Sequence, residues 1–531
     1  MAQQESPTQN HSQSLADSGV TSGANANRGK FFIRTFGCQM NVADSERMSA
    51  LLSEQGLDPT DDPKQAEVIL INGCTVREKA VHKAVSTLGL YQDYEINGRK
   101  PLIGIGGCVG QLDKGAIFKR APYLDFVFGT DTIDQLPEIV YRVRSGERHL
   151  VFTEFDKTRD YSTETKVLGY KAQAFVNIMK GCDKFCTYCI VPFTRGREKS
   201  RTIDEVLNDL ARMAAAGVKE ITLLGQNVNS FGKGNPNSEA REPQELNNII
   251  GKVGPRAGEE NFPQLLRAMD ADPRLKGIKR VRFTSSHPLD FSDELIECYA
   301  TPEKGGVKNL AGHLHLPVQS GSNRVLQKMG RHHQIEHYIA QMDRLRELNP
   351  EVGLSTDLIV GFPTETEEDF QQTIALLDRV QYDNIFAFAY SPRPGTRAAK
   401  LPDDVPDDVK NDRLNRLLKH QLKIAEARYA SRVGKVMEIL VEGEAKNQNL
   451  GRGREIPEGM KVYTGRTTCN RVVNFVNDSP RNLAGKFVNV KITASTSLSL
   501  QGELLHDSAF AEAVASGGPI PRPLVTTEVV Q

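Results

Sequence analysis

The stretch that most constrains this chain runs from Gly181 to Cys189 and reads GCDKFCTYC. Its three cysteines, Cys182, Cys186 and Cys189, follow a CxxxCxxC pattern. The residues just before them, 174–178 (AFVNI), predict a buried strand, so the cysteines lie on a loop at the C-terminal end of a strand. Three thiolates on such a loop can ligate three irons of a 4Fe-4S cube and leave the fourth iron open to a substrate or cofactor.

Two simpler explanations of these cysteines fit the spacing less well. Structural zinc sites use four ligands, and no fourth Cys or His stands near the motif in the sequence. A redox pair would consist of CxxC without the third cysteine. The pattern therefore favours an iron-sulfur cluster with one open iron.

Length and composition set the broad class of protein. The 531 residues are enough for about three domains, and the formal net charge of zero means that a nucleic-acid partner would have to meet a local basic surface. Eight cysteines are too few for a disulfide framework in a chain of this length, so we expect a reducing, cytoplasmic location. No run reaches the ~18 apolar residues of a membrane span. Residues 1–29, which lack the features of a signal peptide, and residues 506–531 are expected to be disordered tails.

Strand and helix patterns alternate over residues 30–146. The expected strands are 31–36, 68–71, 102–105 and 125–128, and the expected helices are 44–55, 77–88 and one from Thr132. Such alternation predicts an α/β domain with a doubly wound parallel sheet.

Three of these strands end in Gly-Cys, at Cys38, Cys74 and Cys108. The carboxyl ends of parallel strands share one edge of a sheet, where ligands bind, so these distant cysteines can converge. The alternative is three buried, inert cysteines. Because the same placement recurs three times, we expect the three cysteines to hold a second 4Fe-4S cluster.

A second alternation, over residues 168–400, follows a polar stretch at 147–166 that looks like a linker. Its expected strands are 174–178, 220–225, 280–284, 313–318, 354–361 and 385–390, with helices between them such as 203–216 and 367–380. Six strand-helix units predict a partial α/β (TIM-like) barrel whose active face lies at the C-terminal ends of the strands. Residues 231–260 interrupt this pattern and are expected to form a surface insertion. Polar residues at or near the strand ends are the candidates for binding a cofactor: Gln226, Ser285, Gln319, Asp357 and Tyr390.

Residues 431–505 change character and become rich in Val, Thr, Ser and Gly with alternating polarity, which predicts a small antiparallel β-barrel. This segment holds 11 Lys plus Arg against 7 Asp plus Glu, a net charge of +4. Small basic barrels often bind RNA, so Arg466, Arg471 and Lys491 are candidate phosphate contacts. The alternative is a solvated domain with no nucleic-acid partner.

The CxxxCxxC motif with Tyr188 before its last cysteine resembles that of the radical S-adenosylmethionine (radical SAM) enzymes. Over residues 30–505 the chain is similar to the methylthiotransferases of that class, which join a three-cysteine domain, a radical SAM core and a C-terminal TRAM domain in this order. The segments that carry the resemblance are 35–41 (TFGCQMN), 224–230 (LGQNVNS), 316–322 (LPVQSGS) and 470–475 (NRVVNF). One departure is Asn72-Gly73-Cys74, where the family often has Asn-Thr-Cys; the cysteine itself is kept.

The resemblance implies a reaction and its partners. Cys182, Cys186 and Cys189 would hold the catalytic cluster that binds and cleaves SAM, and Cys38, Cys74 and Cys108 would hold an auxiliary cluster that supplies sulfur. Gln39, Met40 and Asn41 favour the branch that adds a methylthio group to C2 of N6-(dimethylallyl)adenosine next to the anticodon of tRNA. Other branches act on threonylcarbamoyladenosine or on a ribosomal protein.

We expect a monomer that receives electrons from a flavodoxin or ferredoxin. A rival from a different class is an RNA-binding iron-sulfur protein without catalysis, which would not cleave SAM.

Overall fold

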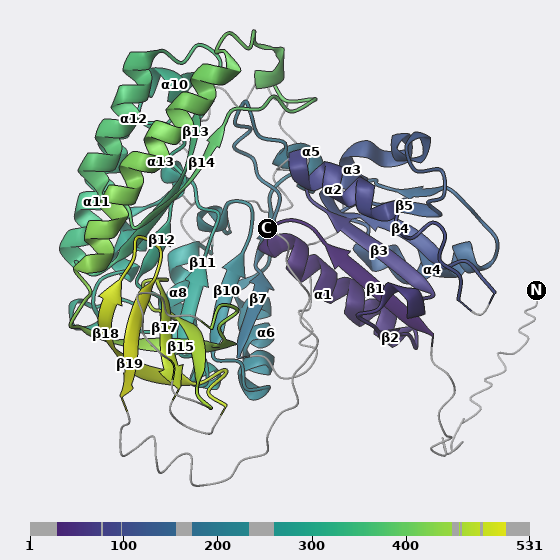
Figure 1. The fold of residues 1–531 in the computed structure, drawn as a ribbon, viewed down its shortest axis with the longest axis horizontal. Helices are drawn as coiled ribbons and strands as arrows, with labels where there is room; N and C mark the ends of the chain where they lie inside the picture. Colours follow the sequence, from purple (N-terminus) through teal and green to yellow (C-terminus); the bar gives the residue numbers. More distant parts are fainter. Residues whose placement is uncertain are drawn as a thin grey trace, which may run out of the picture.

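The computed structural model describes residues 29–75, 78–96, 98–155, 172–232, 260–448, 456, 459–477 and 482–505. The two expected tails and most of the 231–260 insertion lie outside these ranges. Figure 1 shows an N-terminal sheet beside a larger strand-and-helix body, with a small barrel against the lower end of that body. None of the described helices is long and apolar enough to cross a membrane.

The N-terminal domain is built on a six-stranded sheet in which all neighbouring strands are parallel, in the order β2-β1-β3-β4-β5-β6. The strands are β1 (Lys30–Thr35), β2 (Asp58–Pro59), β3 (Val68–Gly73), β4 (Leu102–Gly106), β5 (Phe126–Phe128) and β6 (Leu150–Phe152). The helices are α1 (Gln39–Glu54), α2 (Glu78–Leu88), α3 (Gly107–Asp113) and α4 (Leu136–Arg144). Apolar residues of α1 and α4 pack in one core cluster, and those of α2 and α3 pack in another. Helices thus cover both faces of the sheet, and the doubly wound class is confirmed.

Two details of this domain differ from the sequence-based expectation. Helix α1 begins at Gln39, well before the expected Asp44, because Cys38 is its N-cap residue and donates its backbone N–H to Asn41 Oδ1 at 3.4 Å. Strand β6 lies inside the expected linker at 147–166. It is a three-residue edge strand without a fully buried residue, so hydrophobic periodicity gave no signal for it.

The central domain is an open barrel of two three-stranded parallel sheets, ordered β11-β10-β7 and β12-β13-β14. Its strands are β7 (Gln173–Asn177), β10 (Glu220–Leu224), β11 (Arg280–Phe283), β12 (His313–His315), β13 (Gly353–Val360) and β14 (Asn384–Ala389). A parallel bridge between Val281 and Leu310 joins the two sheets. Among the described residues no ladder pairs β7 with β14, so these two strands are the edges, and the partial barrel is confirmed.

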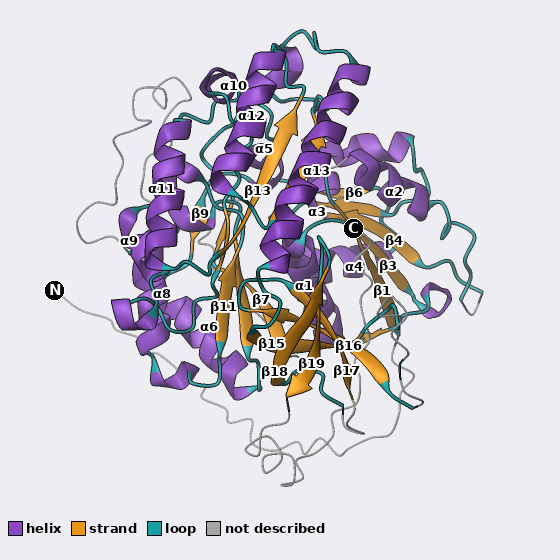
Figure 2. Ribbon diagram, turned by 60° about the vertical axis from the view of Figure 1, so that its left-hand side comes forward, coloured by secondary structure: helices purple, strands orange, loops and turns teal. Residues whose placement is uncertain are grey.

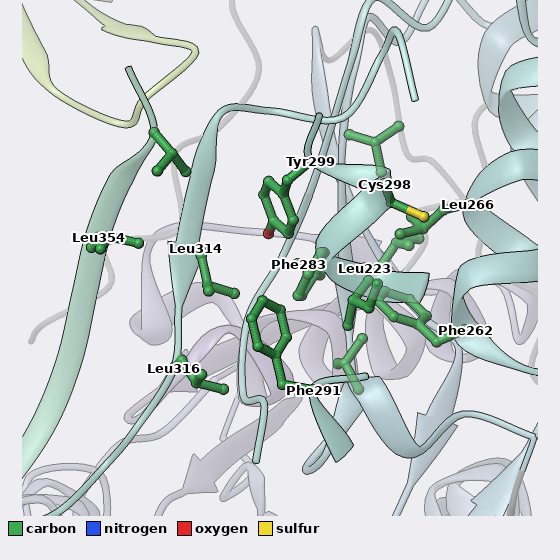
Figure 3. Close-up of a cluster of buried hydrophobic side chains, with 14 of the residues drawn as sticks. Leu223, Phe262, Leu266, Phe283, Phe291, Cys298, Tyr299, Leu314, Leu316 and Leu354 are labelled. Carbon is green, nitrogen blue, oxygen red and sulfur yellow. The ribbon is translucent and has the colours of Figure 1, made fainter. Parts of the chain in front are cut away.

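Outer helices bury the apolar face of these strands. They are α6 (Ile203–Ala215), α8 (Phe262–Ala271), α9 (Asp293–Cys298), α10 (Asn323–Lys328), α11 (Ile335–Leu348) and α12 (Glu367–Val380). Figure 3 shows the packing around Phe283, which meets Phe262 edge-on at 4.9 Å between ring centroids and Tyr299 at 6.0 Å. Leu314 and Leu354 face the same core from the neighbouring strands. Each such side chain contributes ~1.5–3 kcal/mol by burial, and the alternate residues of these strands are left facing the barrel interior.

The C-terminal domain follows the long helix α13 (Asp407–Ala430) and is a closed barrel in the order β15-β16-β17-β19-β18. Its strands are β15 (Val436–Glu444), β16 (Lys461–Thr467), β17 (Val472–Asn477), β18 (Phe487–Ser495) and β19 (Leu500–Leu505). The predicted small barrel is confirmed, but it is mixed rather than antiparallel throughout, because β17 and β19 are parallel. A ring with an odd number of strands cannot alternate direction throughout, so one neighbouring pair must be parallel.

The small barrel is docked on the N-terminal ends of the central strands. Arg282 of β11 donates to the backbone carbonyls of Thr467 and Thr468, and Arg280 donates to the carbonyl of Arg466. Figure 2 shows the small barrel at the lower end of the central strands. The CxxxCxxC loop follows the C-terminal end of β7, so the small barrel and this loop lie at opposite ends of the central strands.

Candidate active site

The CxxxCxxC loop follows the end of β7, and its two ends are held together by backbone pairing. Its two ends pair as a short antiparallel ladder between β8 (Met179–Lys180) and β9 (Lys199–Ser200). Gly181 has φ +76°, and a Cβ there would collide with the carbonyl of Arg197, so the turn needs glycine. Further contacts fix the middle of the loop, where Thr187 N–H donates to the Met329 carbonyl at 2.8 Å.

The three thiols of this loop influence one another. Burial raises the pKa of Cys182 well above its usual value, and the negative charges of Glu198 and Cys189 raise it further. Burial and the charge of Cys186 raise the pKa of Cys189 to about 12. Three thiolates this close together need a compensating positive charge, which bound iron supplies.

Among the described residues, no group of three or more His, Cys, Asp or Glu side chains is placed to hold one metal ion. A 4Fe-4S cube offers a separate iron to each cysteine, so it accepts three thiolates that do not converge on one ion. Cys182, Cys186 and Cys189 form a donor set that such a cube can use.

A buried arginine lies against this set. Arg331 is 4% exposed; its Nη1 donates to Cys186 Sγ at 3.7 Å, and its Nη2 donates to the Pro317 carbonyl. Its Nε is buried and has no hydrogen-bond partner. An unsatisfied guanidinium N–H beside a thiol fits an anionic cluster, whose sulfur atoms would accept it. Sequence reasoning missed Arg331, because nothing in its surrounding sequence distinguishes it from a surface arginine.

The second cysteine set is brought together at one edge of the N-terminal sheet. Gly73 and Gly107 form a parallel bridge that continues the β3–β4 pairing. Gly37 has φ +140°, and a Cβ on it would lie 2.6 Å from the Cβ of Cys74, so the Gly-Cys ends of β1 and β3 adjoin. Burial raises the pKa of Cys108, and the charge of Cys38 raises it further against the lowering effect of Arg195. The structure thus places Cys38, Cys74 and Cys108 side by side, on three strand ends.

A buried polar network supports this edge. Asn72 accepts from Asn41 Nδ2 at 3.0 Å, and its own Nδ2 donates to the Asn41 carbonyl at 2.8 Å and to Ser45 Oγ at 2.9 Å. Thr35 Oγ1 bonds Ser45 Oγ at 2.7 Å. These bonds join the ends of β1 and β3 to the first turns of α1. Sequence reasoning did not assign Asn72 a role; its place directly before Gly73-Cys74 was the available signal.

The two cysteine sets face each other across a domain interface. Helix α5 (Val191–Arg195), which follows the CxxxCxxC loop, packs against α3, which carries Cys108. Thr130 Oγ1 donates to the Thr194 carbonyl at 2.6 Å, and Lys180 pairs with Asp131. Met40 packs near Leu224 in a small apolar cluster between the domains.

Four of the five cofactor candidates surround the mouth and interior of the barrel. Gln226 accepts the Gly181 backbone N–H. Ser285 and Gln319 adopt left-handed backbone with φ of +65° and +77°, a conformation that is uncommon for non-glycine residues. Asp357 lies inside β13, with its Oδ1 3.4 Å from His315 Nε2. None of these placements identifies a cofactor contact by itself, and the assignments stay predictions.

The fifth candidate, Tyr390, lies directly after β14 and is 6% exposed. Its ring packs against Phe362 at 5.1 Å, in an apolar cluster that also contacts Tyr188 of the cysteine loop. Its hydroxyl group is buried without a hydrogen-bond partner. A buried hydroxyl without a protein partner fits a residue that would contact a bound cofactor.

The barrel interior exposes two aromatic rings that sequence reasoning missed. Phe386 and Phe388 on β14, an edge strand of the central domain, are 45% and 38% exposed. They are in register with Asp357 and Ile359 of β13, and Phe386 packs edge-on against His315. The alternation of β14 was the available signal for these residues, but it does not tell which face the helices cover.

The three RNA-binding candidates have different surroundings. Arg471 is 1% exposed, pairs with Asp383 and lies over the Tyr429 ring at 5.4 Å. A side chain buried between domains cannot reach a phosphate, so the prediction that Arg471 contacts RNA is wrong. Lys491 is exposed on β18, and Arg466 is 38% exposed with its Nε on Glu442 at 2.9 Å. The basic character of a residue in an alternating strand says nothing about which side of the barrel wall it occupies.

Comparison with known proteins supports the division into three parts. Residues 30–129 match the Uncharacterized protein family UPF0004, residues 176–377 match the Radical SAM superfamily, and residues 430–505 match the TRAM domain. Among solved structures, the radical S-adenosylmethionine methyltransferase TsrM from Kitasatospora setae is similar in fold, with a TM-score of 0.50 and 12% identity. That match covers 70% of this chain and 77% of the other.

Several relatives over nearly the whole chain are named tRNA-2-methylthio-N(6)-dimethylallyladenosine synthase. The protein from Bdellovibrio bacteriovorus is 42% identical over 474 residues, which cover 89% of this chain and 95% of that protein. The Myxococcus xanthus protein is 43% identical, over 89% of this chain and 94% of that protein. The Acidovorax protein is 44% identical, over 90% of this chain and 97% of that protein. With this identity over almost its full length, and with all three domains in the expected order, the chain belongs to the MiaB-type radical SAM methylthiotransferases.

Proposed function

We propose that this protein is a tRNA-2-methylthio-N(6)-dimethylallyladenosine synthase, which adds a methylthio group to C2 of N6-(dimethylallyl)adenosine next to the anticodon. The observation that carries the proposal is the pair of three-cysteine sets on opposite sides of one domain interface. A single set would support SAM cleavage alone. Two sets supply separate places for SAM cleavage and for sulfur. The names of the relatives point to the same substrate.

The two sets of three cysteines have separate roles. Cys182, Cys186 and Cys189 would hold one 4Fe-4S cluster, and Cys38, Cys74 and Cys108 would hold another. When bound, the first supplies the electron that cleaves SAM and the second supplies sulfur. The chain itself holds the two sites together through the α3–α5 packing, and Cys74, Cys108 and Cys186 are each less than a tenth exposed.

The arrangement also suits an RNA loop. The small barrel and the cysteine loop lie at opposite ends of the central strands, and the eight residues of β13 span ~26 Å at the usual rise per residue. An anticodon stem-loop is long enough to touch both ends along the open side of the barrel between β7 and β14. A base turned out of the loop would then meet the exposed rings of Phe386 and Phe388, which suit stacking.

Lys491 and Arg466 on the small barrel are the remaining candidates for phosphate contacts. We propose that the enzyme works in the cytoplasm as a monomer and takes electrons from a flavodoxin or ferredoxin.

Mass spectrometry of tRNA nucleosides from a strain that lacks this protein tests the proposal. We expect 2-methylthio-N6-dimethylallyladenosine to disappear and N6-(dimethylallyl)adenosine to accumulate, with both changes reversed by the wild-type gene. An unchanged nucleoside profile would contradict the proposal. Loss of methylthiolated threonylcarbamoyladenosine, or of a methylthio group on a ribosomal protein, would instead assign the chain to another branch of the family.

A further inference from the structure

Arg195 belongs to the central domain by sequence but lies in the cysteine edge of the N-terminal domain. It is the last residue of α5, in the segment that begins with Cys189. Its side chain is 6% exposed, and its Nη2 lies 2.7 Å from Asp44 Oδ2, on a carboxylate that is itself 7% exposed. A cation is rarely buried this deeply without a specific anionic partner.

The surroundings of Arg195 place it between the starts of two helices that carry auxiliary cysteines. Asp44 lies on α1, whose N-cap residue is Cys38, and α5 packs against α3, whose second residue is Cys108. The guanidinium of Arg195 is close enough to the thiols of Cys108 and Cys38, and to the carboxylate of Asp44, for its charge to interact with all three.

The ion pair with Asp44 uses only part of the guanidinium. A guanidinium carries five N–H donors, and the pair with Asp44 engages Nη2, which lies 2.7 Å from Asp44 Oδ2. An unmet buried donor costs about 1–3 kcal/mol, and more when it is charged, so it calls for a partner. The nearby acceptors are the sulfur atoms at Cys108 and Cys38, which carry negative charge when they ligate iron.

We propose that Arg195 is a positioning residue for the auxiliary cluster, with its guanidinium donating to cluster sulfur at Cys108 and Cys38 while Asp44 holds it in place. The inference rests on the proposed function only in that a cluster is bound at this set. Because Arg195 and Cys189 share one short segment, the contact also fixes the auxiliary cluster relative to the SAM-cleaving site. Hydrogen bonds and positive charge beside a cluster stabilise its reduced, more negative state, so Arg195 raises the reduction potential of the auxiliary cluster.

The test uses the full-length protein carrying Cys182→Ala, Cys186→Ala and Cys189→Ala, which retains only the auxiliary set. Its midpoint potential and its EPR spectrum in the reduced state are measured after anaerobic reconstitution. With Arg195→Gln added, we expect a lower potential and a changed spectrum at equal iron content. With Arg195→Lys added, we expect a potential between the two, because the charge remains but the planar donor does not.

Asp44→Asn in the same parent separates this role from a simple salt bridge between domains. It removes the ion pair but keeps the cation, so the potential is expected to stay at or above that of the parent, whereas a salt-bridge role predicts the same behaviour as Arg195→Gln. An Arg195→Gln protein with full iron and the parent's potential and spectrum would overturn the inference. If Arg195→Gln fails to retain iron, an Arg195→Lys potential equal to the parent's overturns it and a lower one supports it. A parent that holds no iron would contradict the auxiliary cluster itself, and with it the proposed function.

Discussion

The two cysteine sites do similar chemistry on different scaffolds. Cys182, Cys186 and Cys189 lie on one loop whose ends are closed by the β8–β9 ladder, so the chain needs only that loop to bring them together. Cys38, Cys74 and Cys108 come from three strand ends and meet only when the sheet is assembled. The second site is therefore the more dependent on the fold. Damage to the N-terminal sheet should remove the auxiliary site and spare the other.

Each site also receives a buried arginine, but from a different direction. Arg331, beside Cys186, belongs to the same domain as its cysteines. Arg195, beside Cys108, comes from the neighbouring domain. The auxiliary site thus depends on the domain interface as well as on its own sheet.

The largest expected effect is on iron content. Anaerobically reconstituted wild-type protein should hold about eight irons per chain, four for each cube. Changing all three cysteines of either set to alanine should remove half of that iron and leave the other set filled, because no cysteine is shared. Iron is measured by colorimetric assay and the cluster type by Mössbauer spectroscopy. Wild-type protein that saturates at half the iron, or that takes up zinc, would contradict the account.

A second expected effect concerns the scaffold of the auxiliary site alone. Asn72→Ala leaves the buried side-chain N–H of Asn41 without a partner, at about 1–3 kcal/mol, and removes one of the two hydrogen bonds of Ser45, which keeps its bond to Thr35. We expect the variant to lose auxiliary iron while it still cleaves SAM. Asn229→Ala is the matched control, since Asn229 is also a buried asparagine bonded to a backbone carbonyl but lies in the central domain. Equal retention of auxiliary iron in the two variants would show that the Asn72 network does not support the site.

The C-terminal domain contains one buried and one partly exposed arginine, Arg471 and Arg466, whose replacement should have different effects on stability. Arg471→Ala breaks a buried pair with Asp383, and because Asp383 keeps Arg428 we expect a loss near the lower end of the usual ~3–5 kcal/mol in urea unfolding. Arg466→Ala removes a partly exposed pair and should cost less than ~1 kcal/mol.

For tRNA binding we expect Arg466, which is partly exposed, to matter more than the buried Arg471. A double change of Arg466 and Lys491 to alanine should weaken binding and lower the slope of log affinity against log salt by about one per lost contact. An unchanged salt slope in this double variant would place the RNA contacts on the other two domains.

A smaller effect is expected in the barrel interior. Phe386→Ala combined with Phe388→Ala should weaken binding of an anticodon stem-loop by roughly tenfold, within the ~1–3 kcal/mol that base stacking contributes. SAM cleavage without RNA should persist, because Cys182, Cys186 and Cys189 are unchanged in this variant. Tyr141→Ala, which removes an exposed ring from α4 of the N-terminal domain, is the control. Equal affinities of the two variants for the stem-loop would show that Phe386 and Phe388 do not contribute to RNA binding.

Sequence patterns predicted most of the fold because its elements obey simple periodicities. The buried runs of β3 and β13 and the amphipathic helices α6 and α12 all occur close to their expected bounds. The cysteines were also predictable, one set from local spacing and the other from repeated Gly-Cys strand ends. Short edge strands such as β6 were not, because their few residues carry no burial pattern.

The residues around the cysteines were harder to foresee. Arg195, Arg331 and Arg471 are all buried, yet in sequence each looks like an ordinary surface arginine. Their positions depend on contacts with residues far along the chain, such as Asp44 and Asp383, and no local pattern encodes such a pairing.

The most direct test of the division between the two sites compares Cys108→Ala with Cys186→Ala in a single assay of SAM cleavage and of methylthiolated product. Cys108→Ala should still cleave SAM, because Cys182, Cys186 and Cys189 are unchanged, but it should release no methylthio product. Cys186→Ala should do neither. Product formed by Cys108→Ala at the wild-type rate, or loss of SAM cleavage in that variant while its other cluster remains intact, would contradict the assignment of separate tasks to the two sites.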